Sequence, residues 1–271
     1  MPRIAVLQMT SGIDPEANFQ TIRQAALDAR EGGAEMLFAP EMALLLDRDR
    51  ERAGRRIHHP GGPNWPARIA NVAEECGLWL VVGAPVAGAG SMRANRLWAC
   101  PPSGEPPVAY DKMHMFDVDL ATGESWRESN AYQAGDHPVV VDQTPVGRLG
   151  LTICYDLRFP ALFDTLGLAR CDCIALPAAF TVPTGQAHWH VLVRARAIEA
   201  STFVVAPAQV GSHEDGRQTY GHSLVVDPWG EVLLDMGGEG PGLGFAEIDL
   251  ARIEEVRRQV PSLANRRPMP N

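Results

Sequence analysis

The sequence lacks any long hydrophobic run. Uncharged stretches such as residues 77–91 contain proline or several glycines. A helix that spans a bilayer needs about 20 apolar residues, so we expect no transmembrane segment. The apolar run at residues 4–7 is also too short for a signal peptide. We therefore expect a cytoplasmic protein with no membrane partner.

Cysteine and basic residues are scarce. The five cysteines form an odd set, which fits reduced thiols better than a disulfide framework. Lys and Arg total 24 against 33 Asp and Glu, which gives a net charge of −9. A nucleic-acid-binding protein usually carries a basic face. We therefore expect no nucleic-acid partner.

Common metal-binding and phosphate-binding motifs are also missing. The sequence has no HExxH motif and no P-loop, and Cys171 and Cys173 are too close together for a CxxC knuckle. His188 and His190 lie two residues apart on a predicted helix, so they point to different faces. We expect no zinc site among the eight histidines. The glycines of 238–244 lie between two strand-like runs and are expected to form a loop.

Strand-like and helix-like segments alternate along the 271 residues, and the 22 prolines and 26 glycines are spread through the chain. One domain is the simplest organisation. Strands are predicted over 4–8, 36–39, 78–83, 96–100, 107–110, 139–141, 149–154, 173–176, 203–207, 223–226, 232–234 and 244–248. Helices are predicted over 15–30, 65–76, 159–169, 186–200 and 250–259. This alternation predicts an α/β fold in which helices cover the outer faces of packed sheets.

Cys154 stands where a predicted strand ends and a helix follows, in the run Ile-Cys-Tyr-Asp-Leu-Arg-Phe-Pro. Sheet-based enzymes often place a nucleophile at such a strand end. A free cysteine is more often a small buried apolar residue, and this interpretation applies equally to Cys76 and Cys100.

Two further charged residues follow strand-like runs. Glu41 has apolar residues on both sides, and such a carboxylate needs a partner or acquires a raised pKa. Lys112 lies between Val-Ala-Tyr-Asp and Met-His-Met-Phe. Each residue alone is typical of a structural ion pair or a surface charge, and spacing alone does not bring three distant strand ends together.

These three segments together resemble the nitrilase superfamily of carbon–nitrogen hydrolases. Phe-Ala-Pro-Glu-Met at Glu41, Tyr-Asp-Lys-Met-His at Lys112 and Cys-Tyr-Asp-Leu-Arg-Phe-Pro at Cys154 look like its Glu-Lys-Cys triad. The segments at 187–189, 194–199, 220–223 and 226–230 also match, in the correct order. The resemblance extends over nearly the whole chain and is strongest for the Nit branch.

The resemblance implies a mechanism. Glu41 would take the thiol proton of Cys154, and the thiolate would attack an amide carbon to give a thioester that water then hydrolyses. Lys112 and the backbone N–H of Tyr155 would hold the oxyanion. Glu128 matches a second family glutamate that would orient Lys112, although Glu124 competes for this place and a solvated loop acid is an equal alternative.

Substrate residues are also implied by the resemblance. Arg158 resembles an arginine that the Nit branch directs at a substrate carboxylate, and its alternative is a helix-start arginine bonded to Asp156. Phe180 and Thr181 match a loop that lines the pocket. One departure concerns the helix after the nucleophile, where His190 replaces a family glutamate. This change leaves the substrate open.

The resemblance further implies a four-layer α-β-β-α sandwich over residues 1–271, with 260–271 as a C-terminal tail that reaches a partner subunit. It implies a homodimer or higher homo-oligomer and no cofactor or metal. The expected activity is hydrolysis of a small carboxylic-acid amide, with deaminated glutathione as the first substrate. The alternatives are an ω-amidase acting on α-ketoglutaramate, an N-carbamoyl amide hydrolase, an aliphatic nitrilase and a non-catalytic relative.

Replacing Cys154 tests the nucleophile directly. The change Cys154→Ala is expected to abolish amide turnover while leaving the fold intact, because only the attacking sulfur is removed. Circular dichroism and an amidase assay on both proteins check this expectation. A variant with full activity would remove Cys154 from the mechanism.

Overall fold

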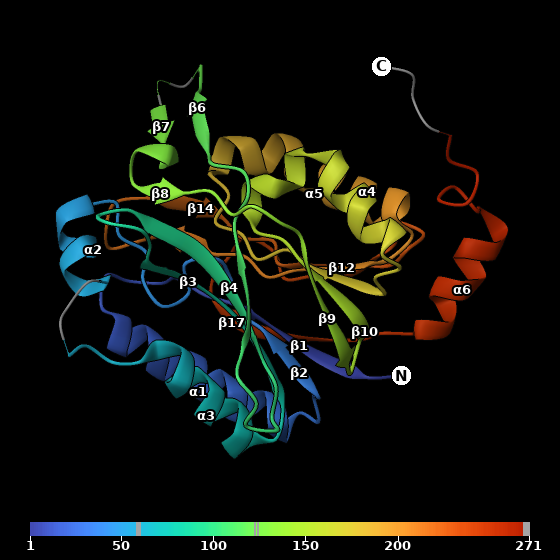
Figure 1. Cartoon of the computed structure of the whole chain (residues 1–271), viewed down its shortest axis with the longest axis horizontal. Helices are drawn as coiled ribbons and strands as arrows, with labels where there is room; N and C mark the ends of the chain where they lie inside the picture. The colour runs from blue at the N-terminus through green and yellow to red at the C-terminus, as the bar shows by residue number, and fades with distance from the viewer. Residues whose placement is uncertain (58–60, 122, 124, 268–271) are drawn as a thin grey trace.

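The computed structural model describes residues 1–57, 61–121, 123 and 125–267. Its helices are α1 (Pro15–Glu31), α2 (Arg50–Ile57), α3 (Trp65–Cys76), α4 (Pro160–Leu168), α5 (Val182–Ala200) and α6 (Leu250–Gln259). Short 3-10 turns are η1 (Glu128–Asn130) and η2 (Cys154–Arg158). Two β-sheets lie face to face, with α1 and α3 outside one and α4 and α5 outside the other (Figure 1). The predicted α-β-β-α sandwich is confirmed.

The two sheets share one plan. The first has the order β17-β1-β2-β3-β4-β5, with β8 on β4, and the second has the order β16-β15-β12-β11-β10-β9. In each sheet three parallel strands form the centre, followed by an antiparallel strand. The first sheet contains β1 (Arg3–Gln8), β2 (Met36–Phe38), β3 (Trp79–Ala87), β4 (Arg93–Cys100), β5 (Val108–Asp111), β8 (Tyr132–Gln133) and β17 (Gly242–Glu247). The second contains β9 (Val139–Thr144), β10 (Gly147–Leu151), β11 (Cys173–Ala175), β12 (Phe203–Ala206), β15 (Leu224–Val226) and β16 (Val232–Asp235).

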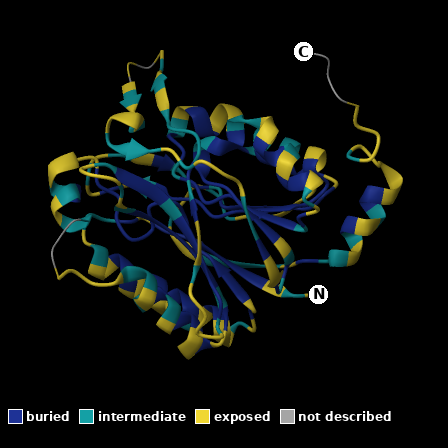
Figure 2. Cartoon of the chain, viewed as in Figure 1, coloured by how far each residue is buried: buried dark blue, intermediate teal, exposed yellow. Residues whose placement is uncertain are grey.

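The central strands of the sandwich bury both of their faces. In β1, Ile4 and Val6 belong to the core that includes the second sheet, whereas Ala5 and Leu7 pack with the helices α1 and α3. This division follows from the two-residue period of a strand. The central strands are accordingly buried, whereas the edge strands β5, β16 and β17 and the outer faces of the helices are partly exposed (Figure 2). A strand buried on both faces reads as an apolar run, and this explains why these runs were recognisable in the sequence.

Several predicted boundaries are confirmed by their capping interactions. Asp14 caps α1 by accepting a hydrogen bond from the Glu16 N–H at 3.0 Å. Gly77 ends α3 in the left-handed conformation, with φ 64°. The predicted hairpin at 225–233 is formed by β15 and β16, which pair antiparallel.

Other boundaries differ from the prediction. The strand expected over 149–154 ends at Leu151, and Cys154 begins the turn η2 instead. The helix expected from residue 186 begins at Val182, because Pro183 fits the first turn of a helix. Helix α2 was not predicted, since it is short and mostly charged. The two-stranded pairs β6 (Asp117–Asp119) with β7 (Ser125–Arg127) and β13 (Val210–Ser212) with β14 (Gln218–Tyr220) were also missed.

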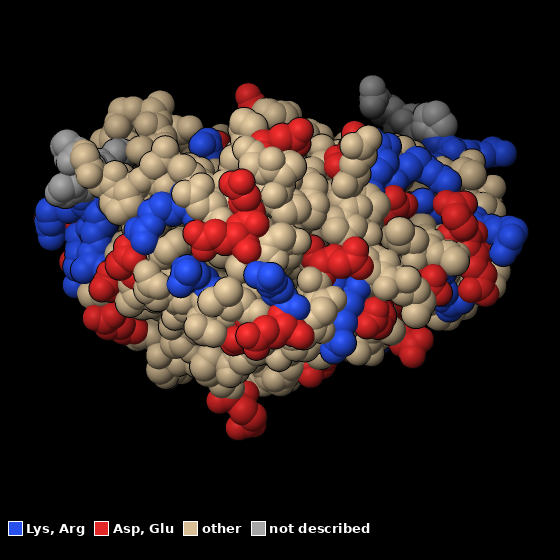
Figure 3. Space-filling model, turned by 90° about the horizontal axis from the view of Figure 1, so that it is seen from below, with Lys and Arg blue, Asp and Glu red and all other residues tan. Residues whose placement is uncertain are grey.

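The surface and the C-terminal segment carry many charges. Acidic and basic side chains are interspersed over the face seen in Figure 3. Beyond α6, Arg266 forms an ion pair with Asp164 of α4 in its own chain. Residues 268–271 of the predicted tail lie outside the described residues. None of the described helices is long and apolar enough to cross a membrane.

Gly83 on β3 allows a close backbone approach next to Glu41. A Cβ atom at this position would lie 2.8 Å from the Pro40 oxygen and 2.9 Å from the Glu41 Cα. The Gly83 oxygen also accepts a hydrogen bond from the Ala43 N–H at 2.7 Å. The segment that carries Glu41 therefore rests directly on β3, and its position depends on the missing side chain.

The change Gly83→Ala should displace Glu41. The added methyl group meets backbone atoms that cannot rotate away, so we expect a loss of about 1–3 kcal/mol in the free energy of unfolding. Amidase activity should fall together with stability. Urea denaturation and activity assays measure both effects.

Gly240→Ala is the matched control, because a Cβ there meets nothing within 4 Å. We expect this variant to keep the stability and activity of the parent protein. Equal behaviour of the two variants would contradict the role assigned to Gly83.

Candidate active site

Four of the predicted site residues line one cavity of about 920 Å³. Glu41 follows β2, Lys112 follows β5, Glu128 begins η1 and Cys154 begins η2. The cavity therefore collects side chains from the ends of strands in both sheets, where α/β proteins commonly bind ligands. The structure brings together residues that spacing alone could not place near each other.

Lys112 lies between two carboxylates. Its Nζ donates to Glu41 Oε1 at 3.1 Å and to Glu128 Oε2 at 2.9 Å. The side chain is only 2% exposed, and it is the only lysine in the sequence. Burial opposes its charge, but the carboxylates of Glu128 and Glu41 outweigh burial and hold the pKa of Lys112 well above its usual range. The cavity thus contains a permanent ammonium group.

Glu41 is fixed by three donors. Besides the Lys112 ammonium, the Asn95 Nδ2 donates to its Oε1 at 2.7 Å and the Ala179 N–H donates to its Oε2 at 2.9 Å. Asn95 also reaches Glu128 Oε1 at 3.2 Å. Asn95 was not predicted as a site residue, because it lies on β4 in a run with no sign of chemistry. Its amide joins the two carboxylates and so helps to fix the geometry of the site.

Cys154 has a strained backbone at the start of η2. Its φ is 47°, in the left-handed region that is unusual for a residue other than glycine. The Cys154 N–H donates to the Pro177 oxygen at 2.9 Å, which ties the turn to the segment after β11. Burial raises the pKa of the Cys154 thiol, and the charge of Glu41 raises it further against the opposing effect of Lys112. The raised pKa favours the neutral form of the Cys154 thiol, and the Glu41 carboxylate beside it can accept a proton.

Asp156 holds the nucleophile turn in place. This fully buried carboxylate accepts hydrogen bonds from the Ile153 N–H at 2.9 Å and the Tyr110 hydroxyl at 2.7 Å. Its other oxygen lies 3.1 Å from the His114 N–H and 2.7 Å from the His114 Nδ1. Asp156 was expected only as a possible partner of Arg158. The structure instead bonds it to the segments on either side of Lys112.

The remaining predicted site residues lie around the same cavity. Tyr155 is the second residue of η2, where backbone N–H groups have no acceptor within the turn. Tyr155, Phe180 and Thr181 all line the cavity. Arg158 is not among the described lining residues. Its guanidinium lies 5.8 Å from the Tyr155 ring centroid and 5.5 Å from that of Phe180, and its Nη1 is 3.3 Å from His188 Nδ1.

Arginines that the sequence analysis missed line this cavity. They come from α2, β4, β7 and loops, and they are Arg48, Arg50, Arg93, Arg127 and Arg217. Arg48 and Arg217 lie over the Trp126 ring, at 5.8 and 5.7 Å from its centroid. Within the described ranges no carboxylate pairs with the guanidinium of Arg48 or Arg50. A cavity with these charges suits an anionic ligand even though the whole chain is acidic.

Two further expectations from the sequence concern Glu124 and the histidines. Glu124, the competitor of Glu128, lies outside the described residues. The expectation of no zinc site among the histidines stays untested, but the structure brings His190 and His222 together at Asp235. His188 and His190 do point apart, as predicted, but the strands of the second sheet bring the distant His222 to α5.

A buried thiol, a carboxylate and an ammonium in one cavity of an α-β-β-α sandwich define a cysteine hydrolase of the nitrilase superfamily. The chain belongs to the carbon-nitrogen hydrolase family, whose model matches residues 3–258. It is therefore an amidase, an enzyme that hydrolyses carbon–nitrogen bonds.

Relatives with assigned names match over most of their length. The chain is 40% identical over 273 residues to the deaminated glutathione amidase of Bos taurus, which covers 99% of this chain and 83% of that protein. It is 38% identical over 266 residues to the deaminated glutathione amidase of Synechocystis, with 97% of each covered. The solved NitFhit protein of Caenorhabditis elegans is 36% identical, with a TM-score of 0.87 over 98% of this chain. This chain spans 65% of the NitFhit chain.

Thiol labelling should single out Cys154. Cys154 faces the cavity, whereas Cys100, Cys171 and Cys173 are completely buried. The pKa of all five thiols is raised by burial, so access to the cavity decides which thiol reacts first. We therefore expect iodoacetamide to alkylate Cys154 first, as measured by peptide mass spectrometry.

The pH dependence of this reaction follows from the raised pKa of Cys154. Because the thiolate is the reactive form and the neutral thiol dominates, the alkylation rate should rise with pH, close to tenfold per pH unit between about pH 7 and 9. A rate that has already reached its plateau at neutral pH would contradict this picture. Cys154→Ala, which should lack the fast phase, is the control.

Proposed function

We propose that this amidase hydrolyses deaminated glutathione through a thioester on Cys154. The observation that carries the proposal is the cavity itself, in which a thiol and a Glu-Lys-Glu cluster lie beside several arginines. The matching names of relatives that share about two fifths of the sequence support the same substrate.

The first half of the reaction uses the neutral thiol. Glu41 takes the proton of Cys154 as the sulfur attacks the amide carbon. The carbonyl oxygen then carries a negative charge, which the Lys112 ammonium and the Tyr155 N–H stabilise. The C–N bond breaks when Glu41 returns its proton to the leaving nitrogen, so the amine departs neutral and a thioester remains.

The second half repeats these steps with water. Glu41 takes a proton from a water molecule, and the resulting hydroxide attacks the thioester carbon. The sulfur leaves and recovers its proton from Glu41, which restores the starting state. Glu128 acts as a positioning residue, because its two oxygens hold the Lys112 ammonium at 2.9 and 3.2 Å.

The substrate's charges fit the cavity's arginines. Deaminated glutathione has a carboxylate at each end and the reacting amide between them. Arg48 and Arg50, which pair with no described carboxylate, are placed to bind one end. Phe180 and Thr181 would form the wall beside the acyl part of the substrate. Arg158, whose guanidinium packs against the Tyr155 and Phe180 rings, would bind a substrate carboxylate. Guanidinium groups suit carboxylates because they donate two parallel hydrogen bonds.

Two further properties belong to this proposal. We propose that the chain forms a homodimer or a higher homo-oligomer, which is supported by exposed apolar side chains such as Val191 and Ile198 on α5 and Trp229. We also propose that it works in the cytoplasm, where its five free cysteines would stay reduced.

The direct test compares two amides that share one acyl group. We expect the wild type to release the amine product from deaminated glutathione, and Cys154→Ala to release none. Turnover of α-ketoglutaramate alone would identify an ω-amidase instead. Turnover of neither compound would remove both substrates from the proposal.

Arg48→Gln tests the charge argument. Losing one charged hydrogen bond costs about 1.5–3 kcal/mol, so KM for deaminated glutathione should rise roughly tenfold or more while kcat changes little. Arg23→Gln is the matched control, because Arg23 pairs with Glu75 on the outer helices. An unchanged KM for Arg48→Gln would show that this arginine does not bind the substrate.

A further inference from the structure

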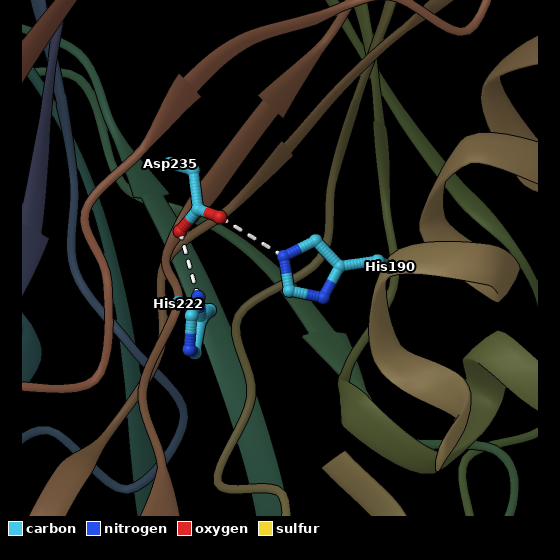
Figure 4. A group of neighbouring side chains, drawn as sticks. All are labelled: His190, His222 and Asp235. Atoms are coloured by element: carbon cyan, nitrogen blue, oxygen red, sulfur yellow. Dashed lines mark hydrogen bonds and ion pairs between the residues drawn. The ribbon is translucent and has the colours of Figure 1, made fainter. Parts of the chain in front are cut away.

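A second cluster of polar side chains lies outside the cavity. His190 comes from α5, His222 from the loop between β14 and β15, and Asp235 from the end of β16. Figure 4 shows both imidazole rings directed at the Asp235 carboxylate. His190 Nε2 lies 3.0 Å from Oδ2, and His222 Nδ1 lies 2.9 Å from Oδ1. None of the three is among the described residues that line the cavity.

The backbone around this cluster is held in place. His222 has φ 54°, a left-handed conformation that is rare outside glycine. Its N–H donates to the Gly237 oxygen at 2.8 Å, and its oxygen accepts from the Trp189 Nε1 at 2.7 Å. The Gly237 N–H in turn donates to Asp235 Oδ1 at 2.9 Å. Strained backbone that is fixed on both sides is typical of functional sites.

Among the described contacts, the Asp235 carboxylate is shared by the two histidines and one backbone N–H. Within the described part of the chain, no lysine or arginine forms an ion pair with Asp235. A carboxylate whose described side-chain partners are two imidazoles offers the oxygen and nitrogen ligands that a zinc ion takes. The side chains of His190, His222 and Asp235 are 34, 25 and 34% exposed, so an ion can enter from solvent and keep water ligands.

We propose that His190, His222 and Asp235 form a binding site for a divalent transition metal ion, with zinc as the ion that best fits two imidazole nitrogens and one carboxylate oxygen. One ligand atom from each residue lies within 4.8 Å of the others. Ligands 2.0–2.1 Å from a tetrahedral zinc lie about 3.3 Å apart. The two existing N···O contacts end on different oxygens of Asp235, so zinc binding through one oxygen would bring the three ligand atoms from within 4.8 Å to about this spacing. Each ring nitrogen must then present its lone pair, and the ring proton moves to the other nitrogen.

The bound ion would link α5 to the strands β15 and β16, with the fourth position left for water. The ion would take no part in amide hydrolysis. Its effect would reach the cavity wall through Trp189, which precedes His190 in the chain. The Trp189 indole donates a hydrogen bond to the His222 backbone oxygen, and its ring centroid lies 4.8 Å from that of Phe180. The ion would therefore stabilise this wall rather than supply chemistry.

Zinc binding is best measured in the Cys154→Ala protein, because this background removes the cavity thiol as a competing ligand. Isothermal titration with Zn²⁺ should give one ion per chain, and Zn²⁺ should raise the melting temperature. Loss of a residue that only supports a metal ligand typically weakens metal binding roughly 10- to 100-fold. His190→Ala and Asp235→Asn each remove a ligand itself, so each should weaken Zn²⁺ binding by at least this factor. The conservative Asp235→Asn variant keeps the size of the side chain, and circular dichroism without metal checks its fold.

His137→Ala is the matched control, since His137 is an exposed histidine that contacts only the neighbouring carboxylate of Asp136 among the described ion pairs. It should bind zinc as tightly as its parent. The proposal is overturned if the parent takes up no ion, or if folded His190→Ala and Asp235→Asn proteins bind Zn²⁺ with the parent's affinity. It is also overturned if His137→Ala weakens binding as much as they do.

Discussion

The structure depends on one buried ammonium group. Lys112 is almost completely enclosed, and its charge is compatible with burial only because Glu41 and Glu128 lie on either side of it. The three groups together carry a net charge of −1, which disfavours a second negative charge on Cys154. The thiol therefore stays protonated until Glu41 accepts its proton, and the transfer leaves the total charge of the site unchanged. The same ammonium is then available to the oxyanion that forms on the substrate.

Other parts of the fold keep this cluster in position. The backbone of Pro40 and Glu41 lies directly against Gly83 of β3, and this contact fixes the distance of Glu41 from the sheet. Asn95 joins the two carboxylates, and Asp156 connects the nucleophile turn to the segments around Lys112. Each contact crosses between strands that are distant in sequence. The two sheets are therefore needed together, because neither supplies both the nucleophile and the ammonium.

The sequence predicts the layers and the central chemistry better than the supporting contacts. Apolar runs placed Glu41, Lys112 and Cys154 at or near strand ends, and the resemblance to the nitrilase superfamily joined them into one site. Asn95 and Asp156 carry no such signal, because their roles arise only where segments meet. The arginines of the cavity are dispersed over several segments, so an acidic composition concealed a basic site. His190 and His222 are 32 residues apart, and only the packing of α5 against the second sheet brings them to Asp235.

The charge state of Lys112 can be measured directly, because the sequence contains no other lysine. A protein labelled with ¹³C and ¹⁵N in lysine should give one side-chain NMR signal, which can be followed as the pH is raised. We predict that this signal stays at the ammonium position beyond the usual lysine pKa of about 10.4, for as long as the protein remains folded. We also predict that Glu128→Gln moves the titration to lower pH. A signal that changes to the neutral amine below about pH 10 in the folded wild type would contradict the account.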